Sequence, residues 1–158
     1  MTNTISGLVR RAASEFGGAP AYVMDGRTLS FGELHEQVRR TAAAYHAQGL
    51  TAGGCVVLWA PNSIDWVVAG LAVTYAGGAL VPANSRYTAH EVADIVERTS
   101  AQLVIIADGF LGKTQIADLK ALRADAPILD LAALDSIGIT DADVDAVENA
   151  ADAVSPDD

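Results

Sequence analysis

The residues best suited to bind a ligand lie in one short polar run, Asn84-Ser85-Arg86-Tyr87. The run follows an apolar segment, and in open α/β sheets ligands bind at loops that follow the carboxyl ends of strands. Arg86 is the only Lys or Arg within residues 41–97, and its planar guanidinium suits an anion such as a phosphate. A surface salt bridge from Arg86 to Glu91 or Asp94 explains the same spacing equally well.

Other residue types that often perform chemistry form no recognised motif here. The glycines match neither a P-loop nor a dinucleotide-binding fingerprint, and no nucleophile elbow is present. His35, His46 and His90 lack the Cys or acidic partners of a metal site, so we expect surface or rim histidines. For Trp59 and Trp66, packing of a strand end against a helix is favoured over lining of a ligand pocket. The sequence therefore predicts no catalytic residue and no metal ligand.

Apolar periodicity predicts alternating strands and helices. Cys55 to Trp59 is continuously apolar, which is typical of a strand covered on both faces. Asp25-Gly26 predicts a tight hairpin turn. Short connections between alternating elements predict an α/β fold, a layered sheet with helices on both faces and much parallel pairing. The predicted strands are 21–24, 28–31, 55–59, 79–81 (ended by Pro82), 103–107 and 128–131, and the predicted helices are 5–16, 31 to a stop at Gly49, 64–76, one starting at Thr88, and 112–124.

Charge is distributed unevenly along the chain. The formal net charge is −10; residues 1–124 carry ten acidic and ten basic residues, whereas residues 125–158 carry ten acidic residues and no Lys or Arg. A neutral body without a basic stripe argues against nucleic-acid binding. We expect residues 1–124 to be an N-terminal α/β portion. Residues 125–158 are expected to be an acidic connecting segment, either solvating the surface or partly ordered.

The longest uncharged stretch, residues 66–85, approaches the length of a membrane span. Gly77-Gly78 and Pro82 interrupt it, which favours a buried helix followed by a buried strand. The single cysteine, Cys55, cannot form an internal disulfide, and this favours a reducing, cytoplasmic location.

Three segments resemble the adenylate-forming (AMP-binding) superfamily, which includes acyl-CoA synthetases, luciferases and peptide-synthetase adenylation domains. They are Leu29–Leu34, Val56–Trp66 and Tyr75–Thr88, in the order and at the spacing of that family. The resemblance implies the first part of the large N-terminal domain of an acyl-CoA synthetase.

The departures from the family pattern are small. Tyr75, Ala83 and Ser85 stand where a basic residue, a leucine and a proline are common. A weaker resemblance, carried by Asn84–Ala89 and Gly109–Gly112, is to synthetases that activate alkanoic side chains of steroid-ring breakdown acids.

The resemblance also implies a reaction. Members use ATP and Mg²⁺ to convert a carboxylic acid into an acyl-adenylate, and the CoA thiol then attacks that adenylate. In CoA-forming members the arginine at the position of Arg86 contacts a phosphate of the CoA nucleotide, which favours the phosphate interpretation of Arg86. The family's phosphate loop, adenine-binding segment, ribose-binding aspartate and C-terminal lysine are expected beyond Asp158. We therefore expect this chain to be inactive alone and to meet the acid, ATP and CoA through the rest of an enzyme.

Two other hypotheses stay open on the sequence. One is a non-catalytic binding or scaffold module that meets a partner through the acidic segment or a sheet edge. The other is a fragment of a different adenylate-forming enzyme, a peptide-synthetase module or a luciferase-like protein. A fragment is also expected to self-associate through unpaired sheet edges.

Overall fold

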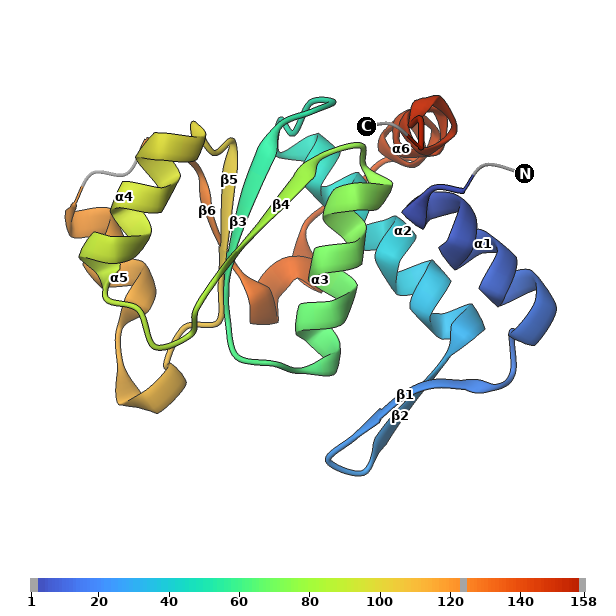
Figure 1. Ribbon diagram of the computed structural model, residues 1–158, viewed down its shortest axis with the longest axis horizontal. Helices are drawn as coiled ribbons and strands as arrows, with labels where there is room; N and C mark the ends of the chain where they lie inside the picture. The colour runs from blue at the N-terminus through green and yellow to red at the C-terminus, as the bar shows by residue number, and fades with distance from the viewer. Residues whose placement is uncertain (1–2, 123–124, 157–158) are drawn as a thin grey trace.

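A four-stranded sheet forms the centre of this computed structural model, which describes residues 3–122 and 125–156. Every neighbouring pair of strands is parallel, so each connection must cross over the sheet. The strand order is β4 (Ala79–Ala83), β3 (Cys55–Trp59), β5 (Leu103–Ile106) and β6 (Ile128–Asp130). Figure 1 shows α2 (Phe31–Ala47) and α3 (Ile64–Tyr75) on one side of the sheet, and α4 (Ala89–Thr99) and α5 (Gln115–Ala121) on the other.

Alternate residues of β3 supply two separate cores. Val56 and Leu58 pack with residues of α2 and α3, whereas Val57 and Trp59 pack with residues of α4 and α5. Because helices cover both faces of the sheet, β3 has no polar face, which explains its continuous apolar run. The predicted layered α/β fold with helices on both faces is confirmed.

Side-chain caps determine where three of the helices begin. α2 starts with a complete capping box between Ser30 and Glu33, and α4 starts with one between Thr88 and Glu91. The hydroxyl of Ser63 accepts the backbone N–H of the third residue after it, at 2.9 Å, and so caps α3. These local signals give the helix starts that the sequence predicts.

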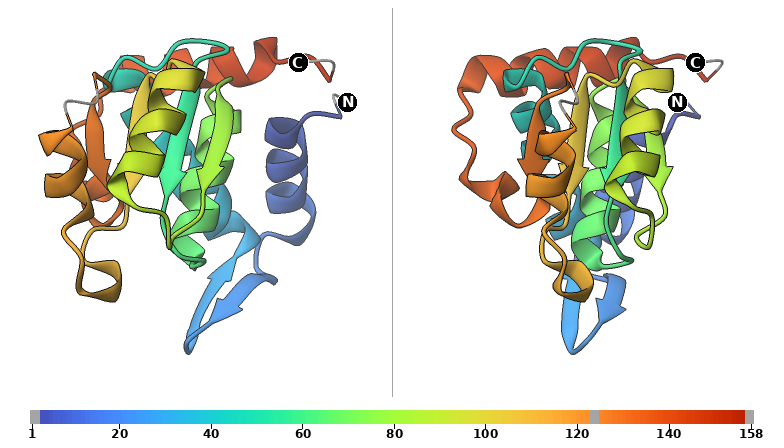
Figure 2. Two further views of the ribbon diagram at one scale, coloured as in Figure 1. Left: turned by 60° about the vertical axis from the view of Figure 1, so that its left-hand side comes forward. Right: turned by 90° about the vertical axis from the view of Figure 1, so that its left-hand side faces the viewer.

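The N-terminal elements lie beside α2, away from the sheet. α1 (Ile5–Phe16) contacts α2, and the antiparallel hairpin of β1 (Pro20–Met24) and β2 (Arg27–Ser30) projects from the body, as Figure 2 shows. Asp25 and Gly26 have φ angles of 51° and 77°, the left-handed pair that a type I′ turn requires. On the apolar stripe of α1, Val9 is buried but Leu8 and Phe16 remain more than half exposed.

The strand after α3 differs from its prediction. The sequence predicts a buried strand that ends before Pro82. In the structure β4 continues to Ala83. It is an edge strand, and only Ala83 is buried. The N–H of Ala79 donates to Gly54 on the β3 side, so alternate residues, including position 82, direct their backbone outward. A proline is tolerated there because no ladder bond is lost. Within the described residues, no helix is long and apolar enough to cross a membrane.

The helix predicted over 112–124 is shorter than expected. A 3₁₀ turn, η1 (Phe110–Gly112), precedes it, and α5 begins only at Gln115. Gly112 has a φ of 69° and Thr114 is also non-helical, so the backbone cannot continue a helix through them. The predicted end at residue 124 lies outside the described residues.

The acidic part of the chain contains ordered elements. It supplies β6 to the sheet, then the 3₁₀ helix η2 (Leu131–Ser136) and α6 (Asp141–Ala153), whose Val147 and Ala151 belong to the core. α6 packs against α2 and α1. The boundary predicted between residues 124 and 125 adjoins residues 123–124, which lie outside the described residues, and the division into two units stays a prediction.

Candidate functional site

The loop that carries Arg86 connects the carboxyl end of β4 to the start of α4. Asn84 shapes the loop, because its side-chain oxygen accepts the N–H of Arg86 at 2.9 Å and its carbonyl accepts the N–H of Tyr87 at 3.0 Å. The loop then runs directly into the capping residue Thr88. The backbone at Arg86 is therefore held in a tight turn, while its side chain is exposed.

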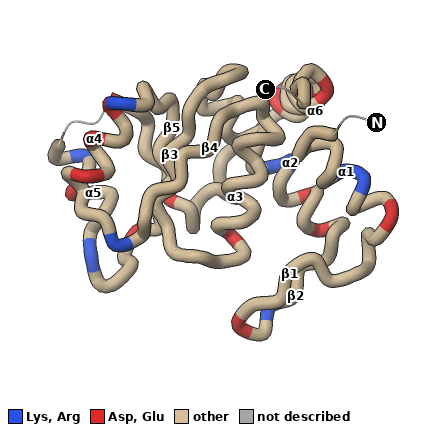
Figure 3. The backbone as a smooth tube through the Cα atoms, in the orientation of Figure 1, with Lys and Arg blue, Asp and Glu red and all other residues tan. Residues whose placement is uncertain are grey.

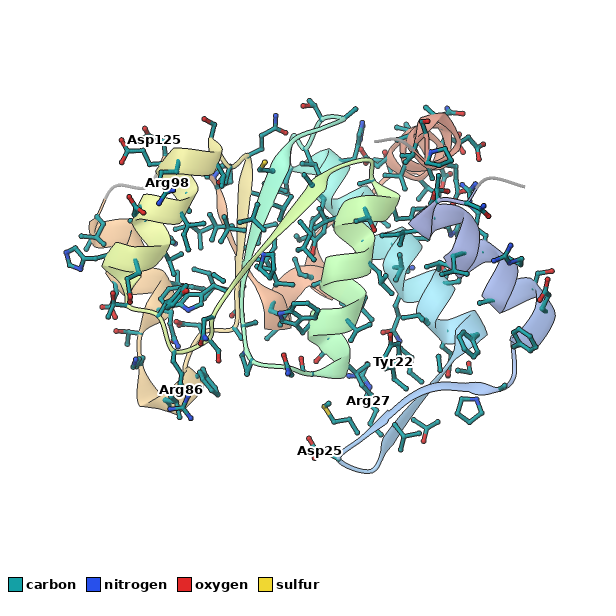
Figure 4. All side chains as sticks on the ribbon, in the orientation of Figure 1. Tyr22, Asp25, Arg27, Arg86, Arg98 and Asp125 are labelled. Atoms are coloured by element: carbon teal, nitrogen blue, oxygen red, sulfur yellow. The ribbon has the colours of Figure 1, made fainter. Side chains whose placement is uncertain are left out.

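The predicted salt-bridge alternative for Arg86 is not observed. The carboxylate of Glu91 accepts the N–H and the hydroxyl of Thr88, each at 2.8 Å, and Asp94 pairs with Arg98 at 3.4 Å. Those hydrogen bonds, from the Thr88 N–H first, lower the pKa of the Glu91 carboxyl. Among the residues that the structure describes, Arg86 takes part in no ion pair. Its guanidinium is available to an anion, and Figure 4 shows the side chain at the lower end of the sheet.

This end of the sheet is also its topological switch point. The chain leaves β3 through α3 on one face and leaves β5 toward α5 on the other, so the loops after these neighbouring strands diverge. Ligands of open α/β sheets bind in the crevice that such diverging loops leave. The carboxyl ends of β3, β4 and β5 all point to the lower edge of Figure 1. The Arg86 loop follows the neighbouring edge strand β4 and lies at this same end of the sheet.

A cavity of about 430 Å³ adjoins the Arg86 loop between α4 and α5. Its walls include Trp59, Tyr87, His90 and Lys113. Lys113 lines this cavity together with residues at the start of α4, and its positive charge adds a smaller contribution to the lowering of the Glu91 pKa by the Thr88 hydrogen bonds. Sequence reasoning missed Lys113, although a cation just after Gly109–Gly112 at the end of a predicted strand was a usable signal.

The two tryptophans lie on opposite faces of the sheet. Trp59 belongs to the core under α4 and α5 and is 3% exposed, whereas Trp66 packs against the core under α2 and α3. They therefore do not line a common pocket. Trp59 ends β3 and packs against helices, as predicted, and in addition lines the cavity, whereas Trp66 lies in the first turn of α3.

The histidines lie apart from one another. His90 lines the cavity, and His46 on α2 approaches Asp143 on α6 at 3.4 Å. The Nε2 of His35 lies 3.2 Å from the hydroxyl of Tyr75, and burial lowers the pKa of His35. No cluster of His, Cys, Asp and Glu among the described residues is arranged to hold a metal ion.

Tyr75 stands at the centre of a second polar cluster, far from the Arg86 loop. Arg10 of α1 donates to the Tyr75 hydroxyl at 2.8 Å, and that hydroxyl donates to Glu148 of α6 at 3.1 Å. Arg10 also pairs with Glu148 and, at 2.5 Å, with Asp152. Figure 3 shows acidic positions on α6 and basic positions on α1 and α2, the helices against which α6 packs. We name Arg10, His35, Tyr75, Glu148 and Asp152 the α6 cluster; its groups bind one another and leave little capacity for a ligand.

Comparison with known proteins identifies the family of the chain. Residues 9–158 match the family model described as "AMP-binding enzyme". The chain is 45% identical over 119 residues to a "3-[(3aS,4S,7aS)-7a-methyl-1,5-dioxo-octahydro-1H-inden-4-yl]propanoyl:CoA ligase" of Rhodococcus jostii, covering 75% of this chain and 23% of the relative. It is 37% identical over 126 residues to the Mycobacterium tuberculosis protein of that name, covering 80% of this chain and 24% of the relative.

The fold of the chain is similar to that of a solved structure. The O-succinylbenzoate coenzyme A synthetase of Bacillus subtilis, in complex with AMP, superposes with a TM-score of 0.73 at 19% identity, over 84% of this chain and 33% of that one. The chain thus spans about a quarter of the length of the curated relatives it matches. With a family model that covers nearly the whole sequence, the chain belongs to the AMP-binding enzyme family, whose N-terminal region it represents.

Proposed function

We propose that the protein to which this chain contributes activates a carboxylic acid with ATP and transfers the acyl group to CoA. The observation that carries the proposal is Arg86, which pairs with no acidic residue of the described chain and lies on the turn after β4, at the same end of the sheet as the switch point between β3 and β5. Arg86 binds a phosphate of the CoA nucleotide, because a planar guanidinium forms paired hydrogen bonds to phosphate. Residues 1–158 supply this contact, and the groups that bind ATP and Mg²⁺ belong to other residues of the enzyme. On that view the chain is inactive by itself.

The substrate class follows from two relatives. Both are named as ligases of a propanoyl group carried by a methylated, fused two-ring dione. We propose a fused-ring alkanoic acid, of the kind left by steroid-ring breakdown, as the acid activated here. An assay of the complete enzyme against straight-chain, aromatic and fused-ring propanoic acids tests this; equal rates with all three classes would contradict it. A peptide-synthetase or luciferase-like role predicts adenylate formation without CoA-dependent product. A cytoplasmic location, where CoA and ATP are available, completes the proposal.

The Arg86 assignment has a direct test in the complete enzyme. Arg86→Ala removes a charge-assisted contact, so the KM for CoA should rise about tenfold while the KM for ATP stays within about twofold. Arg98→Ala is the matched control, because Arg98 is an exposed arginine whose ion pair within the described residues is with Asp94, in the preceding turn of α4. Equal changes in the two KM values, or no change for CoA, would refute the assignment.

The two edge strands of the sheet, β4 and β6, offer little backbone for pairing with a second copy of the chain. β4 presents Pro82 at an outward-facing position, which removes one of the few donors that a second strand needs. β6 offers only three residues. Size-exclusion chromatography over a concentration series tests it, and a growing oligomer fraction would support assembly.

A further inference from the structure

Exposed apolar side chains gather in the N-terminal part of the chain. Of the eight large apolar side chains that are exposed among the described residues, six lie on α1 and β1. They are Ile5, Leu8, Phe16, Tyr22, Val23 and Met24. Val23 has the largest exposed fraction, 67%, and belongs to the hairpin that projects from the body (Figure 2). Apolar groups that gather at one place mark a contact surface, whereas scattered ones are normal.

The outer edge of β1 also leaves backbone groups without partners. Met24 and Arg27 flank a two-residue turn, and in such hairpins the flanking pair is the hydrogen-bonded one. The next pair, Val23 and Thr28, therefore directs its N–H and C=O groups away from the hairpin. Among residues 3–122 and 125–156, no third strand pairs with β1 or β2. A two-stranded hairpin is marginally stable in water, and a free edge is a template for a further strand.

Of the two strands in the hairpin, β1 is better suited to pair with a further strand. It contains no charged residue, whereas β2 contains Arg27, which pairs with Asp65 of α3 at 2.6 Å. Charged side chains are a common protection of a strand edge. At the start of β1 the register shifts between Pro20 and Tyr22, and proline lacks the N–H that a partner strand would use. The usable edge is therefore limited to the three residues centred on Val23.

Charge does not oppose the approach of a second copy at the hairpin. Each copy carries a formal net charge of −10, but residues 16–30 contain one acidic residue, Asp25, and one basic residue, Arg27. Figure 3 shows these two charged positions close together near the tip of the hairpin. The same balance argues against a lipid surface as the occupant, because no excess of Lys or Arg attracts anionic headgroups.

We propose that two copies of this chain form a dimer in which β1 of one copy pairs antiparallel with β1 of the other. A two-fold axis lies beside Val23, so the Val23 N–H of each copy donates to the carbonyl of the partner's Val23. In this register Tyr22 lies opposite the partner's Met24 on each side of the axis, and contacts between an aromatic ring and a thioether are favourable. The two hairpins become one four-stranded antiparallel sheet. Because the paired segment is short, the dimer is weak and forms at high protein concentration.

A charge-swap experiment tests this register, because Val23 lies opposite the partner's Val23. Analytical ultracentrifugation of the chain from about 10 μM to about 1 mM should show a rising dimer fraction. Val23→Lys alone and Val23→Glu alone each place like charges opposite one another and should weaken the dimer about fivefold or more. An equimolar mixture of the two variants should restore dimerisation, which also shows that both are folded. Leu111→Lys, at an exposed apolar position outside the hairpin, is the control and should leave the dimer unchanged.

Several outcomes overturn the proposal. The absence of a dimer at the highest concentration, or a mixture that stays monomeric, rejects pairing at Val23. A chain that dimerises while the complete enzyme stays monomeric assigns the edge of β1 to other residues of the enzyme. A dimer that survives Val23→Lys but is lost in Leu8→Lys assigns the contact to α1. Sedimentation with vesicles of phosphatidylcholine and phosphatidylglycerol in place of dimerisation, lost in Val23→Glu, assigns the surface to lipid.

Discussion

Arg10 and Arg86 lie on opposite sides of the molecule and differ in what surrounds them. Arg10 donates to Tyr75 and pairs with Glu148 and Asp152, and its guanidinium lies 5.2 Å from the centroid of the Tyr75 ring. Arg86 is exposed, with only its backbone N–H held, by Asn84. The guanidinium of Arg10, with partners on α3 and α6, holds elements of the fold together. The exposed guanidinium of Arg86, on a hydrogen-bonded turn, is available to bind a ligand. The comparison predicts that stability depends on the first arginine and binding on the second.

The largest effect is expected at Tyr75, which is fully buried at the centre of the α6 cluster. Tyr75→Ala should lower the free energy of unfolding by about 3–5 kcal/mol, because it leaves a large cavity and removes the partner of Arg10 and Glu148. Tyr75→Phe keeps the ring and should cost only about 1 kcal/mol. Urea denaturation followed by circular dichroism measures both. Equal losses for the two variants would show that the hydroxyl, not the packing, dominates.

The comparison is tested most directly by the same substitution at both arginines. Arg10→Ala should destabilise the chain by about 1–2 kcal/mol, since it leaves Glu148 without its closest cation. Arg86→Ala should change the unfolding free energy by less than about 0.5 kcal/mol. Chemical denaturation of the two variants side by side is the measurement. A stability loss at Arg86 as large as that at Arg10 would remove the distinction between the two sites.

The smallest effect concerns the dependence of stability on pH. Burial lowers the pKa of His35; the negative charge of Glu148 opposes this shift, and the positive charges of Arg39 and Arg10 add to it. The unfolded chain therefore binds this proton first, near the ordinary value of about 6.5, and stability contributed by neutral His35 is lost as pH falls below that value. His35→Gln should reduce the difference in urea midpoint between about pH 7.5 and about pH 5.5. His90→Gln on the exposed start of α4 is the control, and an equal reduction there would contradict the assignment.

Features set by local sequence were predictable. The β3 run, the caps at Ser30, Ser63 and Thr88, and the Asp25-Gly26 turn each depend on a few adjacent residues. Sequence reasoning also selected the Arg86 loop, because polar residues after an apolar strand mark the carboxyl edge.

Features set by distant contacts were not predictable. The exposure of β4 depends on strand order, which places it at the edge, and a sequence window carries no such information. The acidic residues of α6 look like a solvated segment until Arg10, 138 residues before Glu148, is brought against them. The cavity was not predictable either, because its walls combine residues that are distant in the sequence. Trp59 ends β3, Tyr87 lies after β4, and Lys113 lies after β5.

The contact between α1 and α6 has a consequence for how the chain folds during synthesis. Arg10 leaves the ribosome well before Asp152, 142 residues later, so the partners of α1 in the α6 cluster are absent while those residues are being synthesised. Domains acquire structure from the N-terminus onward during synthesis, and contacts of long sequence separation form late. Leu8 and Phe16 of α1, already half exposed in the folded chain, should stay accessible in the nascent protein until α6 is made. We expect chaperones to bind α1 and to leave when α6 docks.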